Sequence, residues 1–232
     1  MKFLSSNSSK ATFITCLSTF ILGYINAYSL LFENSSLVSP QTGNLVNLGI
    51  KLSQGFSAGL LTNLMIFSGF GIGCFLAPWL LSKVKNKQIE FFLTWTVFVA
   101  PIWINLLFIN TITPLFSILL LSFVSGVGLC FFRKINQLDL NNNIMTGNLK
   151  NMYAALFEVT ILKKVEKYKT ILEYALIIFL FFIGTFIAGL LSSYGAFVTL
   201  VIIVGLSLVP YLFNLKALVS LFKQRKDVNN IV

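Results

Sequence analysis

Two long stretches of this sequence carry no charged residue, and they restrict the chain to few folds. One covers residues 91–132, a run of 42 residues, and the other covers residues 174–215. Because a helix crosses the hydrocarbon core of a bilayer with about 20 apolar residues, each stretch is long enough for two crossings. Charged residues make up only 10% of the chain, against roughly 25% in soluble domains. The sequence therefore predicts an all-α, polytopic membrane protein.

The remaining apolar runs bring the predicted number of transmembrane helices to six. The first run, residues 11–32, has 22 residues. A cleaved signal peptide has an apolar region of about 7–15 residues, so we expect an uncleaved helix here. The second span lies at about 56–82, between two lysines, and polar residues at 110–114 and 192–195 divide the two uncharged stretches. The whole chain, 1–232, is then a single transmembrane domain.

Lys and Arg residues are distributed unevenly over the two sides of this six-span topology. Sixteen of the seventeen fall on the side that holds both chain ends, and Lys51 alone falls on the other. Since cytoplasmic loops of membrane proteins are enriched in Lys and Arg, we expect both termini to be cytoplasmic, with residues 215–232 as a basic tail. The same face is expected to bind anionic lipid head groups. Topology thus explains the net charge of +10, and nucleic acid is not an expected partner.

A six-residue motif occurs twice. Residues 42–47 read TGNLVN and residues 146–151 read TGNLKN, so five of six positions are identical at a separation of 104. Each copy follows an apolar span at a similar distance, which predicts two repeat halves at approximately 11–109 and 112–214. Because each half has three spans, an odd number, the second half enters the membrane from the opposite side. The predicted fold is therefore two inverted three-helix repeats, an arrangement typical of secondary transporters.

The paired TGN motifs are the candidate solute site. Thr at a helix start can cap free N–H groups, Gly lets a backbone approach closely, and Asn offers donors and an acceptor. A second interpretation is structural, with Thr and Asn capping two interfacial helices. Asn26, inside the first span, either lines a pathway or hydrogen-bonds to a neighbouring helix. The predicted substrate-binding residues are Asn26, Gln41, Thr42, Gly43, Asn44, Thr146, Gly147 and Asn148.

Catalytic and metal-binding groups are scarce. The chain has no His, which removes the commonest general base and metal ligand. Its three cysteines lie in apolar runs without CxxC spacing, so we interpret them as buried small residues rather than a disulfide or a metal site. Glu33, at the end of the first span, either pairs with Arg133 or marks the membrane interface. We expect no enzymatic activity, no catalytic residue, no metal and no cofactor.

Three segments, residues 23–28 (GYINAY), 38–45 (VSPQTGNL) and 145–149 (MTGNL), resemble the YoaK-like family of bacterial membrane proteins, a family of unknown function. The resemblance extends over nearly the whole chain. It implies a multi-pass protein of the bacterial inner (plasma) membrane and no established activity. The family usually has an acidic residue at the position of Asn26 and a Gln–Asn pair within residues 128–130. If that acid binds a proton or cation in relatives, this chain has lost the coupling.

Two functions from different classes fit these observations. The first is a small-solute transporter or channel with a site formed by the two TGN motifs, for an anion or a small polar organic molecule. The second is a non-transporting membrane assembly or lipid-interacting protein, in which the motifs are structural helix caps. The sequence is also compatible with a homo-oligomer in the lipid bilayer.

Overall fold

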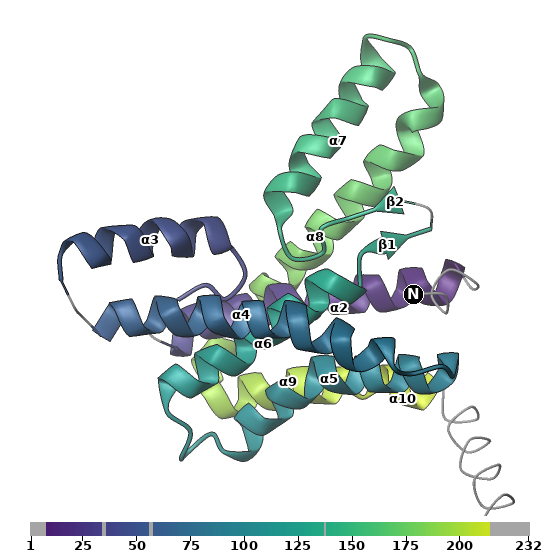
Figure 1. Cartoon of the computed structure of the whole chain (residues 1–232). Helices are drawn as coiled ribbons and strands as arrows, with labels where there is room; N and C mark the ends of the chain where they lie inside the picture. The colour runs from purple at the N-terminus through teal and green to yellow at the C-terminus, as the bar shows by residue number, and fades with distance from the viewer. Residues whose placement is uncertain (1–7, 34–35, 56–57, 137, 214–232) are drawn as a thin grey trace, which may run out of the picture.

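The computed structural model describes residues 8–33, 36–55, 58–136 and 138–213, which form helices joined by loops (Figure 1). The strands among the described residues form one small antiparallel hairpin, β1 (Lys134–Ile135) and β2 (Leu138–Asp139). The helices in chain order are α2 (Ser8–Phe32), α3 (Gln41–Ser53), α4 (Ala58–Ser82), α5 (Lys87–Leu107), α6 (Pro114–Phe131), α7 (Met145–Thr160), η1 (Val165–Lys167), α8 (Tyr168–Leu191), η2 (Ser192–Tyr194), α9 (Ala196–Ser207) and α10 (Val209–Phe213).

Six helical segments in the described part of the chain are long and apolar enough to cross a membrane, so the predicted number of spans is confirmed and the chain is a multi-pass membrane protein. The fifth span begins earlier than residue 174, because the helix continues through Lys169 and Glu173. The Lys169 side chain is 73% exposed and keeps its charge in water, whereas the Glu173 side chain is 13% exposed and accepts a hydrogen bond from Asn136. The basic tail predicted for residues 215–232 lies outside the described residues. The spans are Ser9–Phe32, Gly59–Ser82, Lys87–Leu107, Pro114–Phe131, Val165–Tyr194 and Ala196–Phe213.

The polar turn predicted at residues 110–114 separates α5 from α6. Thr113 is the N-cap of α6, and its hydroxyl accepts a hydrogen bond from the Phe116 N–H. Such a cap satisfies an amide that has no partner within the helix. Pro114 occupies the first turn, where its missing N–H has no cost. Local sequence therefore fixes where the fourth span begins.

Two helix pairs pack with their backbones in contact, α2 with α8 and α4 with α6. At each crossing a glycine faces a backbone carbonyl so closely that a methyl group on the glycine would overlap it. Small residues at such crossings let membrane helices gain close packing. The glycine–carbonyl pairs are Gly23–Phe181 and Gly184–Phe20 for α2 with α8, and Gly69–Leu119, Gly126–Phe70 and Gly73–Phe123 for α4 with α6.

An aromatic core fills the space between α5 and its neighbours. The rings of Phe98 and Phe132 lie 5.0 Å apart at a steep angle, and Trp95 is fully buried beside both. The Trp95 indole N–H donates to the Ser207 carbonyl of α9 at 2.8 Å. Buried indoles usually find such an acceptor, and this bond fixes α9 against α5.

The two shorter helices that carry the TGN motifs fold back along the spans that follow them. In Figure 1, α3 lies beside the first half of α4, and α7 lies beside the first half of α8. The Lys51 ammonium of α3 donates to Asn63 Oδ1 of α4 at 3.1 Å. In the second hairpin, Asn151 of α7 donates to the Tyr174 hydroxyl of α8 at 3.2 Å. Each TGN motif therefore lies beside the middle of the long helix that follows it, rather than beside the end of that helix.

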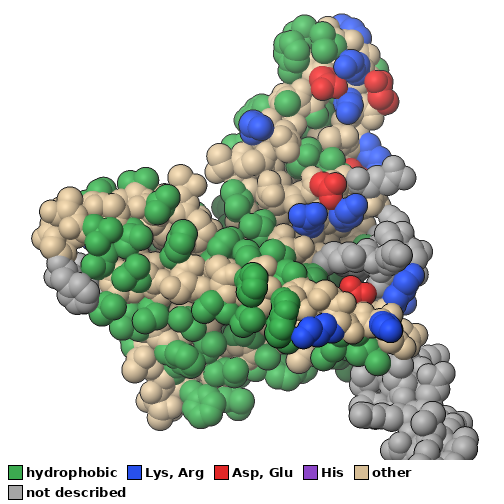
Figure 2. All heavy atoms as spheres, in the orientation of Figure 1, with side chains coloured by type: hydrophobic (Ala, Val, Ile, Leu, Met, Phe, Trp, Pro, Cys, Tyr) green, Lys and Arg blue, Asp and Glu red, His purple; other side chains and the backbone are tan. Residues whose placement is uncertain are grey.

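Hydrophobic side chains are spread over the whole face shown in Figure 2, among uncharged polar side chains and backbone. The Lys and Arg side chains visible on this face lie over the α7–α8 hairpin and toward the end of the bundle that holds the start of α2. No Lys or Arg side chain is visible on this face around α3. An apolar surface of this extent is expected where helices contact lipid, because soluble proteins rarely expose such large patches.

Candidate functional site

A cavity of about 310 Å³ lies where the segments that precede α3 and α7 meet helices α2 and α8. Each of these segments leads directly into a TGN motif. None of the twelve lining residues is charged, and seven of them are apolar. The lining residues are Asn26, Ala27, Leu30, Leu37, Ser39, Pro40, Asn143, Ile144, Met145, Thr146, Phe181 and Thr185.

Buried hydrogen bonds connect the walls of this cavity. Asn26 of α2 donates through Nδ2 to the Ser39 hydroxyl, and its Oδ1 accepts from the Ser39 N–H at 3.1 Å. The Ser39 hydroxyl lies 2.7 Å from the hydroxyl of Ser125 on α6. Asn143 donates through Nδ2 to that same Ser125 hydroxyl at 2.6 Å. Because all four side chains are at most 3% exposed, the network holds both motif-bearing segments in place.

Asn143 keeps one hydrogen-bonding atom unused. Its Nδ2 also donates to the Ser125 carbonyl at 3.2 Å. A carbonyl can only accept, so the amide nitrogen must be the atom that faces it. The Oδ1 atom is then fixed on the other side, buried, and without a hydrogen-bond partner among the described residues. An unsatisfied buried acceptor costs about 1–3 kcal/mol.

The asparagines of the two TGN motifs bind the backbone in equivalent ways. Asn44 donates to the Leu37 carbonyl at 3.0 Å. Asn148 donates to the Asn141 carbonyl at 2.6 Å and accepts from the Asn141 N–H at 3.0 Å. Both partners lie seven residues before the asparagine. The motif asparagines therefore close the loop that precedes each helix and shape the cavity wall, and they do not line the cavity themselves.

The motif threonines do not cap their helices, so that part of the structural interpretation is wrong. Helices α3 and α7 begin one residue before Thr42 and Thr146, and their N-cap residues are Pro40 and Ile144, neither of which makes a side-chain cap. The chain enters each helix from a loop closed by Asn44 or Asn148, which leaves the threonine in the first turn. Both threonines are exposed.

Of the predicted site residues, Asn26 and Thr146 line the cavity. Gln41 follows the lining residue Pro40 and donates to the Val38 carbonyl at 3.2 Å. Gly43 is exposed with open space around its Cα. Gly147 lies against the side chain of Asn141. The cavity is therefore lined mainly by residues that come just before each motif, and less by the motif residues themselves.

Three residues of the buried hydrogen-bond network were absent from the prediction: Ser39, Ser125 and Asn143. A signal for two of them exists in the sequence, since Ser39 precedes Thr42 by three positions and Asn143 precedes Thr146 by three. Ser125 has no such signal, because it joins the site only through the packing of α6. In the described residues no group of three or more His, Cys, Asp or Glu could hold a metal ion. The lining residues of the cavity offer hydrogen bonds and apolar contact.

The model of one protein family, described as "Protein of unknown function (DUF1275)", matches residues 14–213. The chain belongs to the DUF1275 family. The match takes in both TGN motifs and the cavity residues, which confirms the membership of an uncharacterised family predicted from the motifs. No curated protein and no solved structure matched the chain. Membership in DUF1275 implies no activity or substrate, so the function has to be inferred from the geometry of the cavity.

Glu33 of this DUF1275 chain does not pair with Arg133, which was one of two interpretations of its position. The carboxylate accepts a hydrogen bond from the Ser117 hydroxyl at 2.7 Å near the start of α6, whereas Arg133 follows the opposite end of α6. Glu33 is only 7% exposed. Burial raises the pKa of its carboxyl above the ordinary value, and the Ser117 hydrogen bond lowers the pKa by a smaller amount.

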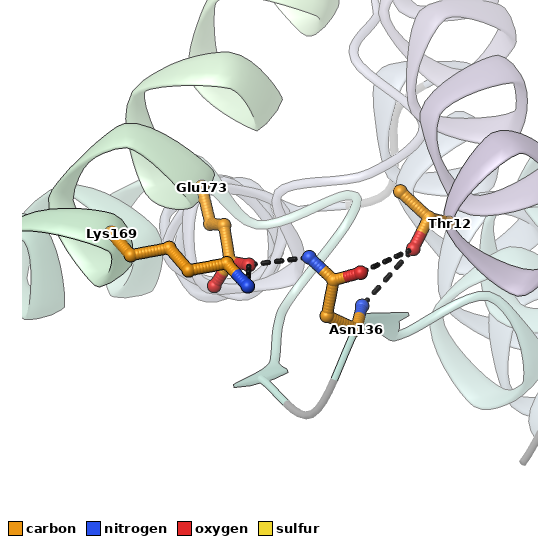
Figure 3. Close-up of polar contacts among 4 residues, drawn as sticks. All are labelled: Thr12, Asn136, Lys169 and Glu173. Carbon is orange, nitrogen blue, oxygen red and sulfur yellow. Dashed lines mark hydrogen bonds and ion pairs between the residues drawn. The ribbon is translucent and has the colours of Figure 1, made fainter. Parts of the chain in front are cut away.

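A second polar cluster joins three elements near the start of α2 (Figure 3). Asn136 lies in the turn between β1 and β2 with φ of 51°, a conformation that Asn tolerates better than most residues. Its N–H donates to the Thr12 hydroxyl at 3.0 Å, and its Nδ2 donates to Glu173 Oε1 at 2.6 Å. Lys169 Nζ lies 3.9 Å from the same carboxylate oxygen. The β-hairpin thus ties α2 to α8 at this end of the bundle.

Proposed function

We propose that this chain is a small-solute transporter or channel, and that the solute occupies the cavity between the segments before α3 and α7. The observation that carries the proposal is that both halves of the sequence contribute residues to the cavity lining. One motif-bearing segment from each half of the sequence contributes to a single cavity beside α2 and α8. Solute sites of secondary transporters lie near the bilayer midplane, where discontinuous helices from two repeats meet.

The packing contacts support two halves related by inversion. Gly23 and Phe20 of α2 lie 103 positions before Gly126 and Phe123 of α6, and each of the four makes a glycine–carbonyl contact. Their partners on α4 and α8 likewise correspond at a constant separation of 111 positions. With three spans per half, the second half has the opposite orientation. The α2–α8 and α4–α6 pairs are then equivalent, and a rocking motion of one half against the other would open the cavity to each side in turn.

The charge distribution supports an orientation for this transporter. We place the start of α2 and the Lys-rich face in the cytoplasm of a bacterial cell, since cytoplasmic loops are enriched in Lys and Arg. The Lys83 ammonium lies 4.0 Å from the ring centre of Trp79, as expected for an interfacial anchor beside anionic head groups. The cluster of Thr12, Asn136 and Glu173 then closes the cytoplasmic end of the α2–α8 pair.

The experiment is a solute-flux screen on reconstituted protein with a cavity-filling variant. Leu30 lines the cavity, while its neighbour Leu31 is exposed and does not. Leu30→Trp is expected to abolish any flux that the wild type carries, because the indole occupies solute space. Leu31→Trp adds the same bulk outside the cavity and should leave the flux intact. Equal flux in both variants, or no flux above protein-free vesicles for any solute in a broad panel, would contradict the proposal.

A second candidate function is a non-transporting assembly or lipid-interacting protein. The observation in its favour is that Asn44 and Asn148 serve backbone closure. Exposed apolar side chains of α3 and α7, Leu45, Val46, Tyr153 and Phe157 among them, would then contact lipid or another protein. For this function, Asn148→Ala lowers folded yield and no solute flux exists for Leu30→Trp to abolish.

A further inference from the structure

We propose that the cavity takes a small uncharged solute that has both a hydrogen-bond donor and an acceptor on a short apolar body, a class that short-chain amides represent. This inference rests on the proposed function, because it names the solute of the same cavity. It is narrower than the sequence expectation, which left open an anion or a small polar organic molecule. The cavity's charge, its free hydrogen-bonding groups and its walls each argue for this class.

The first argument is charge. None of the twelve lining residues is ionisable with a charge at neutral pH, so a bare ion would enter without a counter-charge. Removing an ion from water is far more costly than burying a neutral polar group. The first turns of α3 and α7 begin at the cavity, but a helix terminus attracts an anion only weakly compared with that cost. A neutral solute avoids the cost altogether.

The second argument is the set of hydrogen-bonding groups that remain free. Asn26 and Ser39 are committed to each other and to Ser125. Asn143 Oδ1 has no partner among the described residues and almost no accessible surface, so a solute donor reaches this oxygen only by displacing the atoms that cover it. Thr146 lines the cavity and is exposed, and its hydroxyl can donate or accept. A solute that only accepts, such as a carboxylate, would leave the Asn143 oxygen unsatisfied.

The third argument is the apolar wall and the volume. Seven lining residues are apolar, with Leu30, Leu37 and Phe181 among them. A volume of about 310 Å³ is roughly ten times the ≈ 30 Å³ that one water molecule occupies in the liquid. The cavity therefore has room for a molecule of up to about ten heavy atoms, with a short alkyl part against the leucines and a polar group toward Asn143 and Thr146.

The test uses three probes of nearly equal shape: propionamide, propionate and propylammonium. The reporter is Thr185→Cys in full-length protein without the native cysteines, alkylated by N-ethylmaleimide. Thr185 lines the cavity, but its hydroxyl is already bonded to the Phe182 carbonyl, so its loss leaves the proposed ligand groups intact. Ser193→Cys, exposed and outside the cavity, is the matched control. Ala27→Cys is the second reporter if Thr185→Cys does not fold.

Propionamide is expected to slow alkylation at residue 185 by about threefold when its concentration is twice its Kd. The fraction of protein without ligand is then 1/(1 + [L]/Kd), which is about one third. Alkylation at residue 193 should not change. Propionate and propylammonium should leave both rates unchanged. Stronger protection by either ion, or no protection by propionamide up to its solubility, would overturn the inference. If propionamide protects but the Leu30→Trp comparison shows no flux, the solute class stands and the transport function fails.

Discussion

Asn148 both donates to the Asn141 carbonyl and accepts from the Asn141 N–H, at 2.6 and 3.0 Å. This one side chain therefore satisfies the two backbone groups of a residue seven positions earlier and closes the loop that forms one wall of the cavity. Asn44 makes a single bond of this kind, to the Leu37 carbonyl. The repeated motif thus encodes the same loop closure twice, with two bonds in the second copy and one in the first.

Replacement of Asn148 by Ala is expected to destabilise the protein more than replacement of Asn44. Asn148→Ala removes two hydrogen bonds, each worth about 0.5–1.5 kcal/mol, and Asn44→Ala removes one. Thermal unfolding in detergent should rank the Tm values as Asn47→Ala above Asn44→Ala above Asn148→Ala. Asn47 is an exposed neighbour on α3 and serves as the control. Equal Tm values for Asn47→Ala and Asn148→Ala would contradict the closure role.

Alanine at the glycine crossings should be far more damaging than alanine at other glycines in the same helices. A methyl group at Gly126 or Gly184 would overlap a backbone carbonyl of the facing helix, whereas Gly71 and Gly189 have open space around them. Overpacking of this kind typically costs about 1–3 kcal/mol. Yield of monodisperse protein and Tm should fall for Gly126→Ala and Gly184→Ala. Gly71→Ala and Gly189→Ala should match the wild type, and a loss as large in these two would refute the close crossings.

Stability is expected to fall as pH rises through the pKa of Glu33. Burial raises that pKa in the folded state, so the folded protein holds the proton more tightly than the unfolded chain. The stability contribution is therefore full below the ordinary Glu pKa of about 4.3 and is lost as pH rises through the raised folded value. In a pH series of Tm values, Glu33→Gln should remove this decline, because the amide stays neutral.

Ser117→Ala provides the matched variant for Glu33. The Ser117 hydroxyl donates to the carboxylate and lowers its pKa, so its loss should move the decline in Tm to higher pH. An unchanged midpoint in Ser117→Ala, or a decline that persists in Glu33→Gln, would assign the pH dependence to another group.

The cluster of Figure 3 should depend on Glu173 much more than on Lys169. The Asn136–Glu173 bond of 2.6 Å has a charged acceptor, a type that contributes about 1.5–3 kcal/mol. The Lys169–Glu173 pair is 3.9 Å long with an exposed ammonium, and such pairs contribute about 0–1 kcal/mol. Glu173→Ala should lower Tm clearly, and Lys169→Ala should have little effect. The reverse order would show that the ion pair holds this end of α8.

The spans could be predicted from sequence because absence of charge over about 20 residues is itself the physical requirement for crossing a bilayer. The starts of α3 and α7 near each TGN motif were predictable because Thr and Asn are common at helix starts. The network that forms the site was not, since Ser39 and Ser125 are 86 positions apart and meet only through helix packing. The prediction of threonine caps was wrong because the loops closed by Asn44 and Asn148 let each helix begin one residue before the threonine.

The most direct test of a two-sided solute cavity is the sidedness of labelling at Thr185→Cys in sealed vesicles. A small membrane-impermeant thiol reagent is applied from one side at a time to protein without the native cysteines, with Ser193→Cys as a one-sided control. A transporter or channel should let residue 185 react from both sides, while residue 193 reacts from one. Labelling of residue 185 from a single side, at a rate equal to that of residue 193, would contradict the proposed function.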